Sequence, residues 1–252
     1  MSIIERTIDS KKLGRANNVK LWVPDTGEKL YPTVYLQHGL GDDEQVPWKR
    51  SNLELYAKDY GLIIVTADAK RSWFVNDGRG SESTGGCLWE DYFCYELPSY
   101  IEDNFPAAPK AESRGQCGFS MGGYGAMMYT LLHPNRFTAV SAHSGSFTFA
   151  HEFREDRPER TEFMKAVAAP GSRYDIFALL DNFPDFTKDV PAIRFDVGDR
   201  DHLLEQNRRF HAFLEENCIE HSYIENSGAH QWSYVDSHLR ESLKFFSDRL
   251  TI

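Results

Sequence analysis

Short apolar runs rich in β-branched and aromatic residues alternate along the chain with longer segments in which apolar residues recur every three or four positions. The short runs predict strands at residues 19–24, 33–38, 62–68, 114–119, 137–145, 192–198 and 221–226. The longer segments predict amphipathic helices at residues 49–61, 91–105, 203–218 and 233–250. This alternation is typical of βαβ units, so we expect an α/β protein with a largely parallel sheet covered on both faces. The short connections between the early strands are compatible with an antiparallel edge.

One segment interrupts the alternation. Residues 151–186 are charged and contain several prolines, and they lie between two predicted strands. Two interpretations stay open for them: a lid or substrate wall over one end of the sheet, or a surface insertion. The chain has no internal repeat and no low-complexity linker, and 41% of its 252 residues are hydrophobic. We therefore expect one domain over residues 1–252.

Charge and cysteine content narrow the class of protein. The formal net charge is −10 and the lysines and arginines are scattered, which argues against nucleic-acid binding. The four cysteines form no CxxC pair, so we expect reduced thiols. No apolar stretch approaches the roughly 20 residues of a membrane span, and the start lacks the apolar core of a signal peptide. We expect a cytoplasmic protein without membrane contacts, and a homo-oligomer is compatible with this sequence.

A G-x-S-x-G motif at 118–122 places Ser120 between a predicted strand and a predicted helix. An abrupt strand-to-helix turn forces the serine into a strained conformation that exposes its hydroxyl, and the flanking glycines remove Cβ atoms that would collide. A serine in an ordinary glycine-rich turn is the alternative. Because the strand and the helix are both predicted around the motif, we expect Ser120 to be an activated nucleophile.

The base that a nucleophilic serine needs should follow the last strand in this topology. His230 meets this requirement, since it lies in a small-residue loop after the strand at 221–226 and before the final helix. His143 ends a strand and is the second candidate, although it stands in the wrong chain order. Surface or packing roles are expected for His221 and His238.

The carboxylate that orients the base is expected between the serine and the histidine, and the segment "FDVGDRDHLL" offers three aspartates. Asp196 lies inside a predicted strand. Asp201 lies one loop beyond that strand and reaches the histidine loop more easily, so it is favoured, although it could instead cap the following helix. Asp199 is the second choice. A metal site at "DRDH" is not expected, because no partner cluster accompanies it.

Two main-chain N–H groups should bind the oxyanion of the reaction. Met121 follows the nucleophile and provides one. Leu40, in the "HGLG" loop after an early strand, is expected to provide the other, while His38 holds this loop by hydrogen bonding. Trp73 follows a strand end, where such folds bind ligands, and is the candidate for lining the substrate pocket, with a plain core role as the alternative.

These segments together resemble a known family. The motif "GFSMGGYGAM", the acid segment "GDRDHLLEQNRRFHAFL" and the histidine segment "GAHQWSYVDSHLRESLKFF" are similar to those of the α/β-hydrolase esterases that include tributyrin esterase, S-formylglutathione hydrolase and the antigen 85 mycolyltransferases. The resemblance is greatest to the small tributyrin-type esterases of bacteria. It implies an α/β-hydrolase fold with a small excursion over the active site, and a carboxylic ester hydrolase with neither cofactor nor metal. It also places the acid at Asp201 and the base at His230.

Residue types and resemblance together predict a serine carboxylesterase that acts on small-molecule esters through an acyl-enzyme. We expect acetyl to butyryl esters, because only residues 151–186 are available to roof the site. Alternative activities are hydrolysis of acyl thioesters and acyl transfer to a sugar or lipid hydroxyl. A binding protein built on an inactive hydrolase scaffold is the non-enzymatic alternative.

Overall fold

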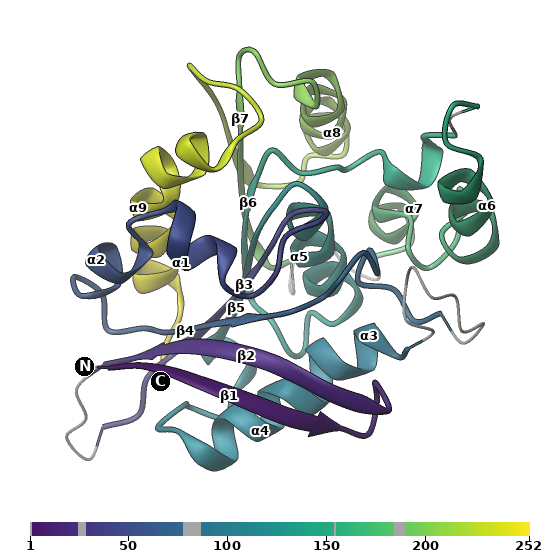
Figure 1. The fold of residues 1–252 in the computed structure, drawn as a ribbon. Coiled ribbons are helices and arrows are strands. Elements are labelled where there is room, and N and C mark those ends of the chain that lie inside the picture. The colour runs from purple at the N-terminus through teal and green to yellow at the C-terminus, as the bar shows by residue number, and fades with distance from the viewer. Residues whose placement is uncertain (1, 25–28, 78–86, 154, 184–189) are drawn as a thin grey trace.

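A computed structural model describes the chain apart from residues 1, 25–28, 78–86, 154 and 184–189. In the described part, eight strands form one sheet in the order β1-β2-β4-β3-β5-β6-β7-β8 (Figure 1). The strands are β1 Ser2–Ser10, β2 Arg15–Val23, β3 Thr33–Gln37, β4 Ile63–Ala67, β5 Arg114–Phe119, β6 Ala139–His143, β7 Ala192–Gly198 and β8 His221–Asn226.

The sheet is parallel except at one edge. Strands β4, β3, β5, β6, β7 and β8 pair in parallel, whereas β2 pairs antiparallel with both β1 and β4. Every residue of β3, β4, β5 and β6 is buried, as expected for strands covered on both faces. The predicted α/β class and the antiparallel edge are therefore confirmed.

Helices cover both faces of the sheet (Figure 1). Apolar residues of α2 and α9 pack on one face, and those of α4, α5, α7 and α8 pack on the other. The helices are α1 Val46–Arg50, α2 Leu53–Ala57, α3 Trp89–Asp91, α4 Leu97–Asn104, α5 Met121–Leu132, α6 Pro158–Val167, α7 Ile176–Asp181, α8 Leu204–Glu216 and α9 Trp232–Arg249. None of the helices described combines the length and the apolar character needed to cross a bilayer.

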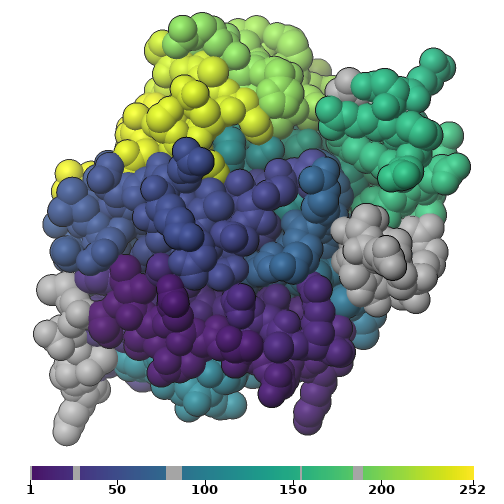
Figure 2. Space-filling model, in the orientation of Figure 1, coloured from purple at the N-terminus to yellow at the C-terminus, as the bar shows by residue number. Residues whose placement is uncertain are grey.

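Three local features differ from the expectation. Strand β1 was not predicted, and the single helix expected at 49–61 is the pair α1 and α2, separated at Ser51 and Asn52. The helix expected at 91–105 extends from Trp89 to Asn104 and contains a π-helical turn at Tyr92–Glu96. The described residues of segment 151–186 include α6 and α7, and they project at the edge of the molecule in Figure 2.

The topology brings the predicted site residues to one edge of the sheet. Ser120 directly follows β5, Asp201 lies three residues after β7, and His230 lies in the connection between β8 and α9. All three positions follow the carboxyl ends of parallel strands, where ligands bind in open α/β sheets.

Candidate active site

Ser120 occupies a sharp turn between β5 and α5. Its φ of 58° and ψ of −116° lie in a region that non-glycine residues rarely adopt. A Cβ at Gly118 would overlap the main chain of Gly122, and a Cβ at Gly122 would overlap the carbonyl of Gln37. Only glycine therefore fits at these two positions, and the turn that the motif predicted is confirmed.

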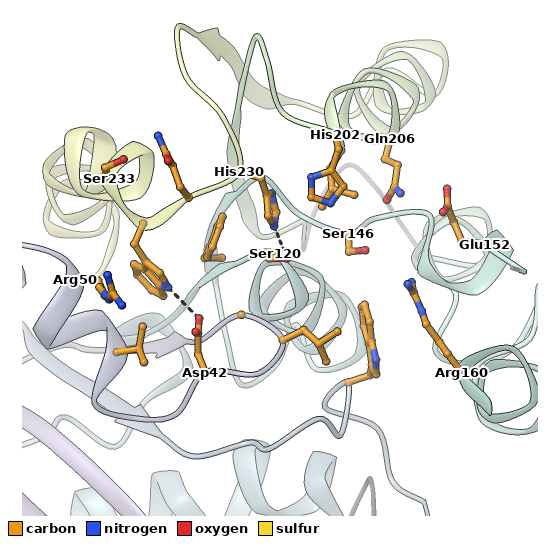
Figure 3. A pocket seen from close by; sticks show the side chains of 18 of the residues that line it. Asp42, Arg50, Ser120, Ser146, Glu152, Arg160, His202, Gln206, His230 and Ser233 are labelled. Atoms are coloured by element: carbon orange, nitrogen blue, oxygen red, sulfur yellow. Dashed lines mark hydrogen bonds between the residues drawn. The ribbon is translucent and has the colours of Figure 1, made fainter. Parts of the chain in front are cut away.

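The side chains of Ser120, His230 and Asp201 form a hydrogen-bonded series (Figure 3). The His230 Nε2 atom lies 2.8 Å from Ser120 Oγ, and its Nδ1 atom lies 2.9 and 3.0 Å from the two Asp201 carboxylate oxygens. The Leu203 N–H donates to the same carboxylate over 2.8 Å. Burial by itself would raise the pKa of Asp201, but hydrogen bonds from His230 and Leu203 outweigh it and hold that pKa below 3.8. Asp201 is therefore an ionised acceptor for His230 at neutral pH.

The other two aspartates of this segment have different partners. Asp199 is half-exposed and accepts the Gly228 N–H over 2.9 Å, so it shapes the loop that carries the histidine. Asp196 is fully buried and accepts from His143 Nδ1 (2.9 Å) and from Arg194 (2.6 Å). Burial would raise the pKa of Asp196, but His143 and Arg194 lower it to about 2. His143 is thus part of a buried network and makes no side-chain hydrogen bond to Ser120.

The loop after β3 lies against the nucleophile. A Cβ at Gly39 would lie 3.6 Å from Ser120 Cβ, which measures how closely the two backbones approach. His38 fixes this loop, because its Nδ1 lies 2.8 Å from the Gly39 carbonyl and its Nε2 accepts the Ala69 N–H over 2.9 Å. Burial lowers the pKa of His38 below 6.5, so the ring is neutral. The structural role expected for His38 is confirmed.

The two amides expected to bind the oxyanion have unused donors. Within the described residues, the main-chain N–H groups of Leu40 and Met121 donate to no other protein group. Leu40 lines the cavity above Ser120, and Met121 is the first residue of α5. Both N–H groups are therefore available to a bound ligand.

A cavity of about 1010 Å³ opens over Ser120. Figure 3 shows Ser120 and His230 in its middle, with Arg50 and Asp42 toward one end and Glu152 and Arg160 toward the other. Its apolar wall consists of Leu40, Val46, Trp73, Phe119, Leu203 and Trp232. Its polar wall includes Ser146, Glu152, Arg157, Glu205, Gln206, Gln231 and Ser233.

Comparison with known proteins defines the family. A model of the family described as "Putative esterase" matches residues 10–246. This chain belongs to that esterase family. It is 22% identical to an acetyl esterase of Caldicellulosiruptor saccharolyticus over 98% of both chains, and 23% identical to an S-formylglutathione hydrolase of Paracoccus denitrificans over 90% of this chain and 86% of the relative. Among solved structures, the fluorophosphonate-binding serine hydrolase F of Staphylococcus aureus superposes with a TM-score of 0.86 at 22% identity, covering 98% of each chain.

The esterase has the α/β-hydrolase fold, with its mostly parallel eight-stranded sheet. The excursion at 151–186 contributes Glu152, Arg157 and Arg160 to the lining of the cavity, and its role as a substrate wall stays a prediction. Trp73 lines the cavity, yet only 6% of it is exposed. Its ring stacks on Phe149 at 3.8 Å and forms part of the core, and its role in lining the substrate pocket stays a prediction.

Two neighbours of the histidine were not predicted. The Phe119 ring lies 4.7 Å from the His230 ring, and the His202 ring meets His230 edge-on at 4.4 Å. The Trp232 indole, at the start of α9, donates to Asp42 over 2.9 Å, and both residues line the cavity. Phe119 and His202 adjoin Ser120 and Asp201 in the sequence, and that adjacency is the only signal that could have indicated them.

Within the part of the chain that the structure describes, two groups of donor atoms are close enough together to suit a metal ion. One group is Asp201, His202 and His230, and the other is His211 and Glu215 of α8 with His221 of β8. In the first group, Asp201 and His230 are already hydrogen-bonded to each other, so a metal would have to break that contact. The arrangement favours proton transfer between Ser120 and His230, with Asp201 as the ionised hydrogen-bond partner of the ring.

Proposed function

We propose that this esterase hydrolyses carboxylic esters of short acyl chains, acetyl to butyryl, with Ser120 as nucleophile, His230 as general base and Asp201 as the residue that orients the base. The observation that carries the proposal is the pair of contacts at His230, 2.8 Å to Ser120 Oγ and 2.9 Å to Asp201, at the floor of an open cavity. This geometry lets one imidazole accept a proton on Nε2 while the carboxylate stabilises the resulting charge through Nδ1.

In the proposed reaction, Ser120 Oγ attacks the ester carbonyl carbon as its proton moves to His230 Nε2. The Leu40 and Met121 N–H groups bind the oxyanion that forms. When the intermediate collapses, the bond to the alcohol oxygen breaks and His230 protonates that oxygen. A water molecule then attacks the acyl-enzyme, giving a proton to His230, and the acid leaves as Ser120 Oγ takes the proton back.

The composition of the cavity supports short acyl groups. Each buried methylene contributes about 0.8 kcal/mol of binding only where it meets an apolar wall. Charged and amide side chains interrupt the apolar wall, with Glu152, Arg160 and Gln206 at one end and Arg50 at the other (Figure 3). A long acyl chain would lie against these groups, whereas the volume of about 1010 Å³ leaves room for a sugar or aryl alcohol. The proposed role of Trp73 is to border this alcohol.

A panel of p-nitrophenyl esters tests the proposal. We expect kcat/KM to peak between acetyl and butyryl and to fall for octanoyl and longer esters. Ser120→Ala should remain folded and lose roughly 10⁴–10⁶ in kcat, and a serine-reactive phosphonate should label the wild type at this residue. A preference for long chains would refute the short-chain assignment, and activity that persists in Ser120→Ala would refute the nucleophile.

Acyl thioesters are the second class to include in this panel, because a relative is an S-formylglutathione hydrolase. Product analysis in the presence of sugar acceptors separates hydrolysis from acyl transfer, since transfer yields the acylated sugar in place of the free acid. A thioester kcat/KM far above that of every oxygen ester would replace the proposed ester substrate and leave the roles of the three residues intact.

A further inference from the structure

Three side chains of the types that bind metal ions meet between the end of α8 and the start of β8. His211 and Glu215 lie one turn apart on α8, so they share a face of the helix, and His221 is the first residue of β8. One ligand atom from each of the three lies within 4.8 Å of the other two. This α8–β8 cluster is at the amino end of a parallel strand, whereas Ser120 follows the carboxyl end of one.

His221 is the most firmly held member of the α8–β8 cluster. Only 1% of its side chain is exposed, and its Nδ1 atom lies 2.7 Å from the Ile219 carbonyl oxygen. A carbonyl can only accept a hydrogen bond, so Nδ1 carries the proton and Nε2 of the neutral ring presents a lone pair. Donation of one ring N–H to a main-chain carbonyl is also how proteins commonly orient a histidine that binds a metal.

His211 and Glu215 face this lone pair. The His211 Nδ1 atom lies 2.7 Å from His221 Nε2, and a Glu215 carboxylate oxygen lies 3.8 Å from the same atom. A zinc ion with bonds of about 2.1 Å holds two ligand atoms roughly 3.4 Å apart, so the two rings need to separate by only about 0.7 Å to admit one. His211 is half-buried and Glu215 is exposed, so both side chains have room for this adjustment.

We propose that His211, Glu215 and His221 bind a divalent transition-metal ion of the Zn²⁺ type, which ties the end of α8 to the start of β8. Two imidazoles and one carboxylate suit such an ion, whereas Mg²⁺ and Ca²⁺ favour sites made of oxygen ligands. In the metal-free protein, His211 Nδ1–H donates to His221 Nε2. On binding, this proton moves to His211 Nε2, so both rings stay neutral and each gives one lone pair to the ion.

The ion has a structural role in this proposal. Glu215 lies on the exposed side of the cluster, where a water molecule completes the fourth position of the ion. Because the cluster is at the opposite edge of the sheet from Ser120, the ion takes no part in ester hydrolysis. The inference is therefore independent of the proposed function.

Zn²⁺ titrated into the whole chain, after treatment with a chelator, tests the proposal. Isothermal titration calorimetry should detect a saturable site. At about 100 times its Kd, Zn²⁺ should raise Tm by roughly 5 °C, because an ion that binds only the folded chain stabilises it. Mg²⁺ at the same concentration should leave Tm unchanged.

Variants identify the ligands. His211→Gln and Glu215→Gln should each weaken Zn²⁺ binding at least about tenfold, since loss of a group that merely orients a ligand already costs roughly 10–100-fold. Glu216→Gln is the matched control, because it removes the same charge one position further along α8, about 100° around the helix axis, and Glu216 is not in the cluster. It should bind Zn²⁺ as the wild type does. Circular dichroism of the metal-free variants checks their folding.

The group at Asp201 near Ser120 is the other candidate for Zn²⁺. Zinc bound there blocks ester hydrolysis and is indifferent to Glu215→Gln, so a site that survives this substitution counts against the proposal. The proposal is also overturned if Zn²⁺ leaves Tm unchanged, or if the control variant weakens binding as much as the two ligand variants. In those cases the pair His211 and His221 is a hydrogen bond between two rings and nothing more.

Discussion

At the scale of single residues, the conformation of Ser120 costs of the order of 1–3 kcal/mol for a side chain other than glycine. Hydrogen bonds on both sides of the residue offset this cost. The Ser120 N–H donates to the His143 carbonyl over 3.0 Å, and the Ser120 carbonyl accepts from Tyr124 and Ser146 at 3.1 and 3.2 Å. The main chain therefore holds Oγ toward His230 before any substrate binds, which is the pre-organisation that a nucleophile requires.

Substitution of the two loop aspartates separates their roles. Asp201→Asn should lower kcat by about 10⁴, because an amide at this position favours the wrong tautomer of His230. Asp199→Asn should cost less than about tenfold, since it weakens one hydrogen bond to Gly228 in the loop and removes no contact to the histidine. Steady-state kinetics on p-nitrophenyl acetate measure both, with circular dichroism as the check on folding. The opposite ranking would transfer the orienting role to Asp199.

The sequence predicted the three residues of the series because each follows from a local rule. The spacing of the glycines around it predicts Ser120, and the position after the last strand predicts His230. Asp201 is predicted because it lies one loop beyond β7 and can reach the loop that carries the histidine. The ring contacts of Phe119 and His202 with His230 could not be predicted, because they depend on side-chain orientations that only the folded loops determine.

At the scale of elements, the buried strands were predictable and the edges were not. Strands β3 to β6 are buried along their whole length, so their apolar runs are continuous. In β1 only Ile8 and Ser10 are buried, and its alternation of apolar and polar residues is correspondingly weak. The break between α1 and α2 depends on Asn52, whose N–H and side-chain amide both donate to Asp236 of α9, a contact 184 positions away that no local pattern contains.

The strand-to-helix turn at Ser120 has no room for one additional methyl group at Gly122. Gly122→Ala would place a Cβ on the main-chain carbonyl of Gln37, so either β3 or α5 has to move. We expect a loss of about 1–3 kcal/mol in the free energy of unfolding and a large loss of activity, both measured on one protein sample by urea denaturation and ester hydrolysis. Gly61→Ala is the control, since its Cβ would come no nearer than 3.9 Å to the Tyr31 ring. Equal stability of the two variants would contradict the close approach of α5 to β3.

At the scale of the whole molecule, the cavity is assembled from segments that are remote in sequence, including the loops after β3, β4, β5, β7 and β8, the start of α9 and the excursion. The sequence of the excursion is compatible with both a wall and an insertion, because neither its charge nor its prolines reveal what it packs against. Buried contacts provide the answer. The Tyr124 hydroxyl of α5 donates to the Tyr174 carbonyl over 2.6 Å, and Ile176 and Phe177 are part of the core.

Glu90, in α3, joins this excursion to the end of α5. The carboxylate is buried and lies 2.6 Å from an Arg173 guanidinium nitrogen, 2.8 Å from the Tyr174 hydroxyl and 2.9 Å from His133 Nε2. Burial would raise the pKa of Glu90, but the hydrogen bonds from His133 and Tyr174 hold it below 4.5. The excursion is thus anchored by one ionised group beneath it, while its outer residues Arg157 and Arg160 line the site.

Glu90→Gln should loosen the excursion and leave the chemistry in place. An amide offers one acceptor oxygen where the carboxylate offers two, so at least one of the three donors loses its partner, at a cost of about 1.5–3 kcal/mol for hydrogen bonds to a charged group. Hydrogen exchange should accelerate over residues 173–181, and KM should rise several-fold with kcat nearly unchanged, since the wall contacts substrate and the triad does not move.

Glu102→Gln is the matched control, because Glu102 is also a largely buried partner of an arginine, Arg114, remote from the cavity. It should lower stability and leave both KM and exchange over residues 173–181 as in the wild type. If the two variants raise KM equally, the effect belongs to general destabilisation and Glu90 is not the anchor of the substrate wall.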